Sequence, residues 1–512
     1  MTQPTRREFL IGASAMIGSA ASVRVAHAET SEWDFASARD CAAALRAKRI
    51  SSLELVDHTI ERIGALDRDI NAVVVHDFDR AREAAKNADA ALARGDEGVL
   101  LGIPVTVKES FNVAGLPTCW GDPRYRHFMP KEDALAVTRL KKAGAVIFGK
   151  TNAPLWLSDW QSYNSVYGTT NNPWDRRLTP GGSSGGSAAA LAAGFGALSL
   201  GSDMGGSLRA PAQYCGVYAH KPTLGLAPRR GHAPPGGPAT PVENGLAVIG
   251  PMARSAADLS LAFNVIAGPE EAGYRLDLPP ARRNRLADFR ILVVDAHPLG
   301  PTAVAIREAI AALVEKLART GAKLSDKTLP LPDLAQSARL QALLMSAWRG
   351  AGLSRREYER AFVTAGRLSP RDRSLAAERA RGLTLSYREW LDADAQREGV
   401  RQQWRDVFRD WDIVICPAAP TLAFPHDHSL PMESRRLRVD GKSWPYLDAQ
   451  LVWSTVATIP GLPATVAPIG MAKGLPVGAQ IIGPWLEDRT PIEFANLLER
   501  AFGGFTPPPS MR

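Results

Sequence analysis

Five short apolar runs, separated by helix-length segments, do most to constrain how this 512-residue chain can fold. They lie at residues 103–107, 145–148, 197–200, 291–294 and 413–415, and most are rich in valine and isoleucine. Short runs of this kind are typical of β-strands, and a strand that is apolar throughout is buried on both faces of its sheet. The pattern therefore predicts an α/β fold.

Two stretches have mainly helical patterns. In the first, apolar residues recur at helical spacing, and Ser51 and Glu54 are placed as a helix start with its cap. The second, residues 337–409, is rich in alanine and arginine. We predict a helical N-terminal segment at residues 29–95, followed by one large domain at residues 96–505 that contains the second stretch.

The first 28 residues have the pattern of an export signal. The pair Arg6-Arg7 precedes a weakly apolar run rich in alanine and glycine, and Ala26-His27-Ala28 follows as a small-residue cleavage pattern. This order predicts a twin-arginine-type signal peptide at residues 1–28 and a periplasmic protein. The alternative is an ordinary amphipathic helix. No later run is apolar and long enough for us to expect a membrane span.

Charge, cysteines and histidines exclude several classes of function. The net charge is +8, but the basic residues are scattered, with only short clusters such as residues 282–285, so we expect no nucleic-acid partner. The four cysteines are widely spaced, which argues against a disulfide or zinc framework. Residues 426–428 (His-Asp-His) lack a further ligand at a metal-site spacing, so we expect no metal and no cofactor.

The stretch LTPGGSSGGSAAALAAG, residues 178–194, raises the question of a nucleophile. Its Gly181–Gly185 part matches the G-x-S-x-G pattern of a hydrolase, with Ser183 as the serine. Such a serine must follow a buried strand, whereas residues 171–180 are polar and contain prolines. The alanine-rich residues after it place its glycines at a helix N-terminus, where backbone N–H groups converge and an anion or oxyanion site is reasonable.

A better turn for a nucleophile lies downstream, where residues 198–203 lead into a Gly-Gly-Ser turn that ends at Ser207. Glycines allow the backbone to direct N–H groups at one point, as an oxyanion hole requires. Two residues are candidates for the base that activates the serine. One is His220, for which a packed position is at least as expected, and the other is Lys108, at the end of an apolar run. Burial lowers the pKa of a lysine and frees its amine, although many lysines at strand ends reach solvent.

Three motifs together resemble the amidase signature family: residues 102–118 (GIPVTVKESFNVAGLPT), 181–194 (GGSSGGSAAALAAG) and 201–212 (GSDMGGSLRAPA). Further similar segments are spread over most of the chain after residue 28. The resemblance implies a single large amidase-signature domain, with a central mixed β-sheet that is covered by helices on both faces. It also implies an amidase that hydrolyses a carboxylic amide C–N bond to an acid and an amine or ammonia.

The resemblance further implies a Ser-cisSer-Lys triad. Ser207 is the nucleophile that forms the acyl intermediate, Ser183 is the bridging serine with a cis peptide bond, and Lys108 is the base. The implied oxyanion hole and supporting residues are Met204, Gly205 and Gly206, with Ser184, Asp203 and Arg209. The chain departs from the family at Met204, where threonine is frequent, and at Thr458, where asparagine is frequent.

The substrate is expected to be a small-molecule amide with an aryl or apolar group. This expectation depends on aromatic residues in segments that can line a pocket: Trp120, Phe128, Trp156, Trp160, Tyr163 and Trp453. Three alternatives stay open: an esterase, a glutaminase subunit of the same family, and a binding protein on an amidase scaffold. The presence of all three triad residues argues against the last. The sequence leaves a homodimer open.

Overall fold

The computed structural model describes residues 31–271, 273–325 and 331–511. The predicted signal peptide, residues 1–28, lies outside this part of the chain. Residues 32–512 form one compact unit, and the description below concerns this unit.

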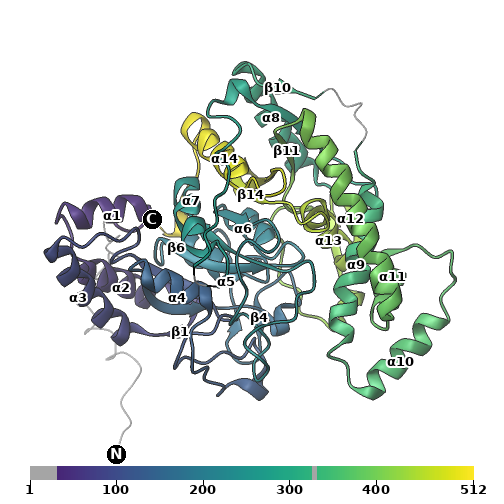
Figure 1. Cartoon of the computed structure of the whole chain (residues 1–512), viewed down its shortest axis with the longest axis horizontal. Coiled ribbons are helices and arrows are strands. Elements are labelled where there is room, and N and C mark those ends of the chain that lie inside the picture. Colours follow the sequence, from purple (N-terminus) through teal and green to yellow (C-terminus); the bar gives the residue numbers. More distant parts are fainter. Residues whose placement is uncertain (1–30, 272, 326–330, 512) are drawn as a thin grey trace, which may run out of the picture. The chain divides into compact units, whose positions relative to one another are not determined.

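An eleven-stranded sheet forms the centre of this unit (Figure 1). Its strands are β1 (Val73–His76), β2 (Pro104–Lys108), β3 (Val146–Thr151), β6 (Leu198–Asp203), β7 (Tyr218–Lys221), β8 (Val248–Ala253), β9 (Arg290–Val293), β10 (Lys323–Leu324), β11 (Ile413–Pro417), β14 (Ala464–Ala472) and β15 (Leu475–Ile482). Their order is β1-β3-β2-β6-β8-β7-β14-β15-β11-β9-β10. The pairs β3-β2, β2-β6, β11-β9 and β9-β10 are parallel and the others antiparallel. The sheet is therefore mixed, as predicted.

All five apolar runs form strands of this sheet: β2, β3, β6, β9 and β11. Every residue of β2, β3, β6 and β11 is buried. A strand can be buried along its whole length only when both faces of its sheet are covered.

Helices surround the sheet (Figure 1). They are α1 (Ala38–Arg46), α2 (Ser52–Ile70), α3 (Phe78–Arg94), α4 (Leu135–Lys142), α5 (Gly185–Ala192), α6 (Arg209–Cys215), α7 (Ala256–Ile266), α8 (Val304–Arg319), α9 (Leu334–Gly350), α10 (Arg355–Gly366), α11 (Leu375–Gly382), α12 (Tyr387–Asp410), α13 (Tyr446–Thr458) and α14 (Arg489–Phe502). Two short hairpins, β4-β5 (Tyr163–Asn164 and Gly168–Thr169) and β12-β13 (Arg436–Val439 and Lys442–Pro445), lie outside the sheet.

Both helical predictions hold, with one addition. Residues 337–409 lie in α9 to α12, and the N-terminal segment forms α1, α2 and α3. The predicted cap of α2 is present, because the Ser51 side chain accepts from the N–H of Glu54 and the Glu54 side chain accepts from the N–H of Ser51. The N-terminal segment also contributes strand β1 to the edge of the sheet beside β3.

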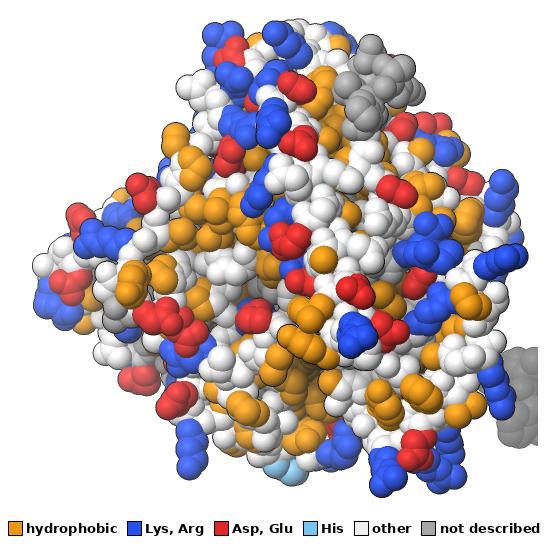
Figure 2. Space-filling view, turned by 45° about the vertical axis from the view of Figure 1, so that its right-hand side comes forward, with side chains coloured by type: hydrophobic (Ala, Val, Ile, Leu, Met, Phe, Trp, Pro, Cys, Tyr) orange, Lys and Arg blue, Asp and Glu red, His pale blue; other side chains and the backbone are white. Residues whose placement is uncertain are grey.

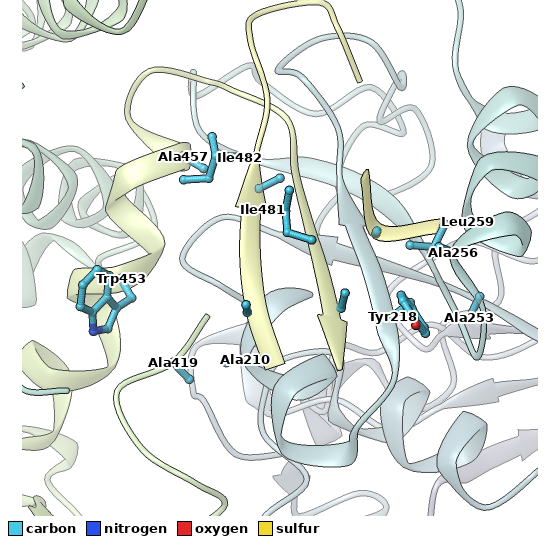
Figure 3. Close-up of a cluster of buried hydrophobic side chains, with 14 of the residues drawn as sticks. Ala210, Tyr218, Ala253, Ala256, Leu259, Ala419, Trp453, Ala457, Ile481 and Ile482 are labelled. Carbon is cyan, nitrogen blue, oxygen red and sulfur yellow. The ribbon is translucent and has the colours of Figure 1, made fainter. Parts of the chain in front are cut away.

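A large apolar core connects the sheet to the helices around it. Figure 3 shows part of this core, with Ile481 and Ile482 from β15, Trp453 and Ala457 from α13, and Leu259 from α7. These side chains are nearly or completely buried. The core joins segments that are far apart in the sequence, which fixes the sheet relative to α7 and α13.

The order of the strands positions the turns that follow β2 and β6. These two strands are parallel neighbours, with Val105 beside Leu198 and Val107 beside Leu200. Their carboxyl ends therefore lie at the same edge of the sheet. Lys108 ends β2, and the turn that contains Ser207 follows β6.

Figure 2 shows charges of both signs on one face of the molecule. On the face shown in Figure 2, lysine and arginine side chains are interspersed with aspartate and glutamate. Within residues 31–271, 273–325 and 331–511, no helix is both long and apolar enough to cross a membrane.

Candidate active site

Lys108 lies in a buried cluster of hydroxyl groups. The lysine is completely buried, and its Nζ lies 2.6 Å from Oγ of Ser183. The same Nζ lies 3.1 Å from Oγ of Ser184 and 3.0 Å from Oγ of Ser202. The structure thus brings Lys108 and Ser183 together, as the sequence predicted, and adds Ser202, which the motifs did not single out.

The surroundings of Lys108 favour its neutral form. Burial lowers the pKa of Lys108 from 10.5 to about 7, although the negative charge of Asp203 acts in the opposite direction. Its three side-chain partners are neutral hydroxyls, which compensate poorly for the lost hydration of an ammonium group. Near pH 7 a large fraction of the lysine is therefore an uncharged amine.

The loop that contains Ser183 has a special backbone. The peptide bond between Gly182 and Ser183 is cis, as expected. A Cβ on Gly182 would lie 2.4 Å from the carbonyl oxygen of Asp159, so only glycine can occupy this position. Ser162 holds the loop from outside, because its Oγ lies 2.9 Å from the carbonyl oxygen of Gly181. The chain then enters α5, which confirms the predicted helix start.

Asp203 and Arg209 hold the turn between them, which contains Ser207. Both side chains are completely buried and form an ion pair, with Arg209 Nη2 2.8 Å from Asp203 Oδ1. Burial by itself would raise the pKa of Asp203, but the charge and hydrogen bonds of Arg209, together with backbone N–H groups of Gly206 and Leu208, lower it to about 2. Asp203 is therefore a carboxylate that accepts four hydrogen bonds.

The N–H of Gly206 corrects one expectation. This group donates to Oδ1 of Asp203 at 2.8 Å, so it is not free to bind an oxyanion as predicted. The N–H groups of Met204, Gly205 and Ser207 differ from that of Gly206, because no backbone carbonyl of the described residues accepts a hydrogen bond from them. In this turn the N–H of Gly206 is bonded to Asp203, and the N–H groups of Met204, Gly205 and Ser207 are the remaining candidates to bind an oxyanion.

The two departures from the family pattern both lie at this site. Thr458 accepts a hydrogen bond from Arg209 Nη2 at 2.7 Å, so it supports the ion pair under the turn. Met204 lines the cavity above the turn. Its carbonyl oxygen accepts from Nε2 of Gln341 at 3.2 Å, which ties the turn to α9.

A cavity of about 350 Å³ opens beside the turn. Ser183 and Ser207 both line it, but Lys108 does not, so the amine lies behind Ser183 when seen from the cavity. Its aromatic walls are Trp120, Trp156, Trp160 and Trp348. A mostly apolar cavity with a few polar groups is typical of a small-molecule site.

The sequence predicted this lining only in part. Trp120, Trp156 and Trp160 contribute to it, whereas Phe128, Tyr163 and Trp453 do not. Trp453 fails because it is completely buried in the core beside the sheet. Trp348 was missed because it lies on α9, where its spacing resembles that of a core residue.

His220 is not at the site. It is completely buried on β7, with Nδ1 2.9 Å from Thr465 Oγ1 and Nε2 3.1 Å from Asp488 Oδ1. Burial lowers its pKa despite the nearby carboxylate. This histidine links β7, β14 and the start of α14. Of the two roles that the sequence left open for His220, a base or a packed residue, the structure supports the second.

Comparisons with known proteins agree with this fold and site. The model of the Amidase family matches residues 54–491. A glutamyl-tRNA(Gln) amidotransferase subunit from Anaeromyxobacter sp. (strain K) is 34% identical to the chain, over 92% of this chain and 97% of the relative.

Solved structures give the same result. A chain from a vestigial protein complex related to the origins of an s-triazine catabolic enzyme superposes with a TM-score of 0.76 at 29% identity, covering 91% of this chain and 99% of that chain. A bacterial aryl acylamidase of the amidase signature enzymes has a TM-score of 0.76 at 23% identity, covering 92% and 96%, and supports the fold alone.

The class is therefore that of the amide-hydrolysing enzymes. The chain belongs to the amidase family, and its predicted α/β amidase-signature fold is confirmed.

Proposed function

We propose that the chain hydrolyses a small carboxylic amide through an acyl intermediate on Ser207, with Lys108 as the base acting through Ser183. One observation carries the proposal. A completely buried lysine, with its pKa lowered to about 7, lies 2.6 Å from a serine that lines the cavity, while the lysine itself does not reach the cavity. A base in this position reaches a substrate only through a hydroxyl that lines the cavity, and the hydroxyl of Ser183 is nearer to the amine than that of Ser202.

The hydroxyl cluster orients the lone pair of the amine. Ser184 Oγ lies 3.2 Å from the carbonyl oxygen of Ser202, to which it donates, so it accepts from the lysine. Ser202 Oγ is the second acceptor for the two N–H bonds of neutral Lys108. The lone pair then faces the hydroxyl of Ser183, which passes on a proton from Ser207 as Ser207 attacks the carbonyl carbon.

The turn supplies the stabilisation of negative charge. The N–H groups of Met204, Gly205 and Ser207 surround the site where the carbonyl oxygen becomes an oxyanion, and each such donor contributes about 3 kcal/mol to lowering the barrier. Asp203 holds the turn from below and is kept from the oxyanion by its own ion pair. The proton then returns through Ser183 to the leaving nitrogen, and water releases the acid from Ser207.

The cavity supports an aryl or other apolar amide. Four tryptophans line it, together with Met345 and Leu451. Rings of this kind bind flat apolar groups by contact over a large area.

Hydrolysis of a panel of aryl, aliphatic and amino-acid amides by the purified protein tests the proposal. Ser207→Ala and Lys108→Met should each remove turnover by at least about 10³-fold and leave a folded protein. Full activity in Ser207→Ala, with loss only in Ser183→Ala, would assign the nucleophile to Ser183 instead.

A second candidate is the release of ammonia from glutamine as part of an amidotransferase. It is favoured by the 34% identity with a glutamyl-tRNA(Gln) amidotransferase subunit. Glutamine turnover that exceeds that of every aryl amide, or appears only with an added partner chain, would favour this candidate.

We also propose that the protein is exported, on the pattern of residues 1–28. Cell fractionation with N-terminal sequencing of the mature protein tests this. The unprocessed chain in the cytoplasm alone would refute it.

A further inference from the structure

Two adjacent buried side chains of the cavity wall have unsatisfied nitrogen atoms. Arg229 and His232 both line the cavity, with 8% and 5% of their surface exposed. Among the described residues, nothing accepts from or donates to Arg229 Nε or His232 Nδ1. A buried polar atom without a partner costs about 1–3 kcal/mol. A ligand in the cavity can remove this cost.

The imidazole of His232 presents a donor at Nδ1. Burial, followed by the charges of Lys108 and Arg229, holds the pKa of His232 well below 6.5, so the ring is neutral. Its Nε2 lies 3.0 Å from Oγ of Ser110, and which of these two atoms donates depends on the tautomer of the ring. We assign Ser110 as the donor to Nε2, which places the ring hydrogen at Nδ1.

Arg229 and His232 lie on one tight turn. The N–H of His232 donates to the carbonyl oxygen of Arg229 at 2.8 Å, which closes a tight turn. The rings of Phe111 and Trp120 flank the imidazole, with centroids 4.6 Å and 5.4 Å from its own. His232 therefore cannot turn its Nδ1 toward another partner without disturbing both rings.

The charges on the cavity wall favour an anion. Each of the two carboxylates in the wall forms an ion pair with an arginine: Asp159 lies 2.6 Å from Arg435, and Asp203 is paired with Arg209. By contrast, Nη2 of Arg229 donates to the carbonyl oxygen of Val242 at 3.1 Å and pairs with Glu243 at 3.2 Å, and 67% of the Glu243 side chain is exposed to solvent. Water weakens that pair, so the guanidinium keeps much of its attraction for a buried anion.

A further cation lies in the same wall. Arg349, on α9, lines the cavity and forms no ion pair with a carboxylate of the described residues. The wall therefore combines donors, excess positive charge and aromatic surface. An anion with two acceptor oxygens is complementary to such donors, and a carboxylate is small enough for a cavity that also holds an aromatic ring.

We infer that the substrate is an aryl amide with a carboxylate at the end remote from the amide, and that Arg229 and His232 bind this carboxylate. The inference rests on the proposed function, because it identifies the substrate class of the same site. Arg229 and His232 are thus specificity-determining residues, and they take no part in the proton relay.

Two pairs of probes test the inference, one for each side of the scissile bond. The first pair is 4-acetamidobenzoate and 4-nitroacetanilide, and the second is 4-carbamoylbenzoate and 4-nitrobenzamide. In each pair a neutral nitro group replaces a carboxylate of the same shape. The readout is the ratio of kcat/KM for the carboxylate probe to that for the nitro probe, compared between variants so that intrinsic reactivity cancels.

In at least one pair, Arg229→Gln and His232→Phe should each lower this ratio by about 10- to 100-fold, the range for a hydrogen bond to a charged group. A variant that only weakened the structure would lower both rates and leave the ratio unchanged. Arg177→Gln serves as the control, because Arg177 is exposed and lies outside the lining residues. Arg229→Lys and His232→Gln each keep a hydrogen-bond donor and should lower this ratio less than the first two variants. They also test the inference if the first two variants fail to fold.

Binding measured by calorimetry in Ser207→Ala separates recognition from turnover. Tighter binding of one carboxylate probe than of its nitro analogue supports the inference. Equal binding of both probes would show that the two nitrogens do not bind the carboxylate, and would overturn it. A ratio that falls only in Arg349→Gln would also overturn the assignment. Hydrolysis of amides without any preference for charge defeats the inference and leaves the proposed function standing, whereas no hydrolysis of any amide defeats the proposed function itself.

Discussion

Replacement of Lys108 by methionine should change the way in which stability depends on pH. In the folded protein, burial lowers the pKa of Lys108 from 10.5 to about 7. Between these two pH values, the unfolded chain keeps a proton that the folded chain has lost. The free energy of unfolding of the wild type therefore rises with pH in this window, by about 1.4 kcal/mol per pH unit.

The methionine variant has no titrating group at this position and lacks this rise. Relative to the variant, the wild type should gain about 5 kcal/mol between pH 7 and pH 10.5, which is the free energy that corresponds to the change in pKa. Below pH 7 the lysine is protonated in both states, so the difference between the two proteins should not change there.

Urea unfolding of both proteins, from about pH 6 to about pH 10, measures this difference. Lys142→Met is the matched control, because Lys142 is exposed on α4, and its curve should run parallel to that of the wild type. Parallel curves for the wild type and Lys108→Met would refute the argument that burial makes the amine neutral.

Three further predictions concern the same site. The rate constant kcat/KM for an aryl amide should rise with pH and level off above about 7, because the amine of Lys108 must be neutral, and a flat pH profile would contradict this. Arg209→Met leaves the buried carboxylate of Asp203 unpaired and should cost about 3–5 kcal/mol in urea unfolding, whereas a loss under about 1 kcal/mol would show that the pair is solvated. Gly186→Ala places a Cβ 2.4 Å from a backbone nitrogen and should lower the free energy of unfolding by at least about 2 kcal/mol, measured by thermal unfolding. The control Gly64→Ala, in α2, has open space around its Cβ and should leave the stability unchanged or raise it in the same assay.

The sequence predicted the parts of the fold that local pattern determines. The runs that became β2, β3, β6, β9 and β11 are apolar over their whole length, so their burial was visible from composition alone. The strands β7 and β8 were missed because they contain His220, Lys221, Gly250 and Pro251. Such residues are stable in a buried strand only through distant partners, as His220 is through Asp488.

The site was predicted unevenly for the same reason. The pairing of Lys108 with Ser183 was implied by the family resemblance, and the structure places the two side chains 2.6 Å apart. The direction of the Gly206 N–H could not be predicted, because it depends on the turn of the backbone around Asp203. The cavity wall was harder still, since Arg229, His232 and Trp348 reach it from a loop and a helix far from the motifs.

The arrangement of the sheet separates two tasks that an enzyme of this kind must perform. The amine and the serine turn are placed by β2 and β6, two strands bonded directly to each other within the buried sheet. Most of the cavity wall comes instead from α9 and from the loops that contain Trp120, Trp156 and Arg229. Gln341 ties α9 to the turn, but Trp348 and Arg229 lie in the wall and form no hydrogen bond to the turn among the described residues, so we expect changes at these two positions to alter which amides are accepted without moving the turn. Substitutions at these wall positions can therefore change substrate selectivity with little change in the positions of Lys108, Ser183 and Ser207.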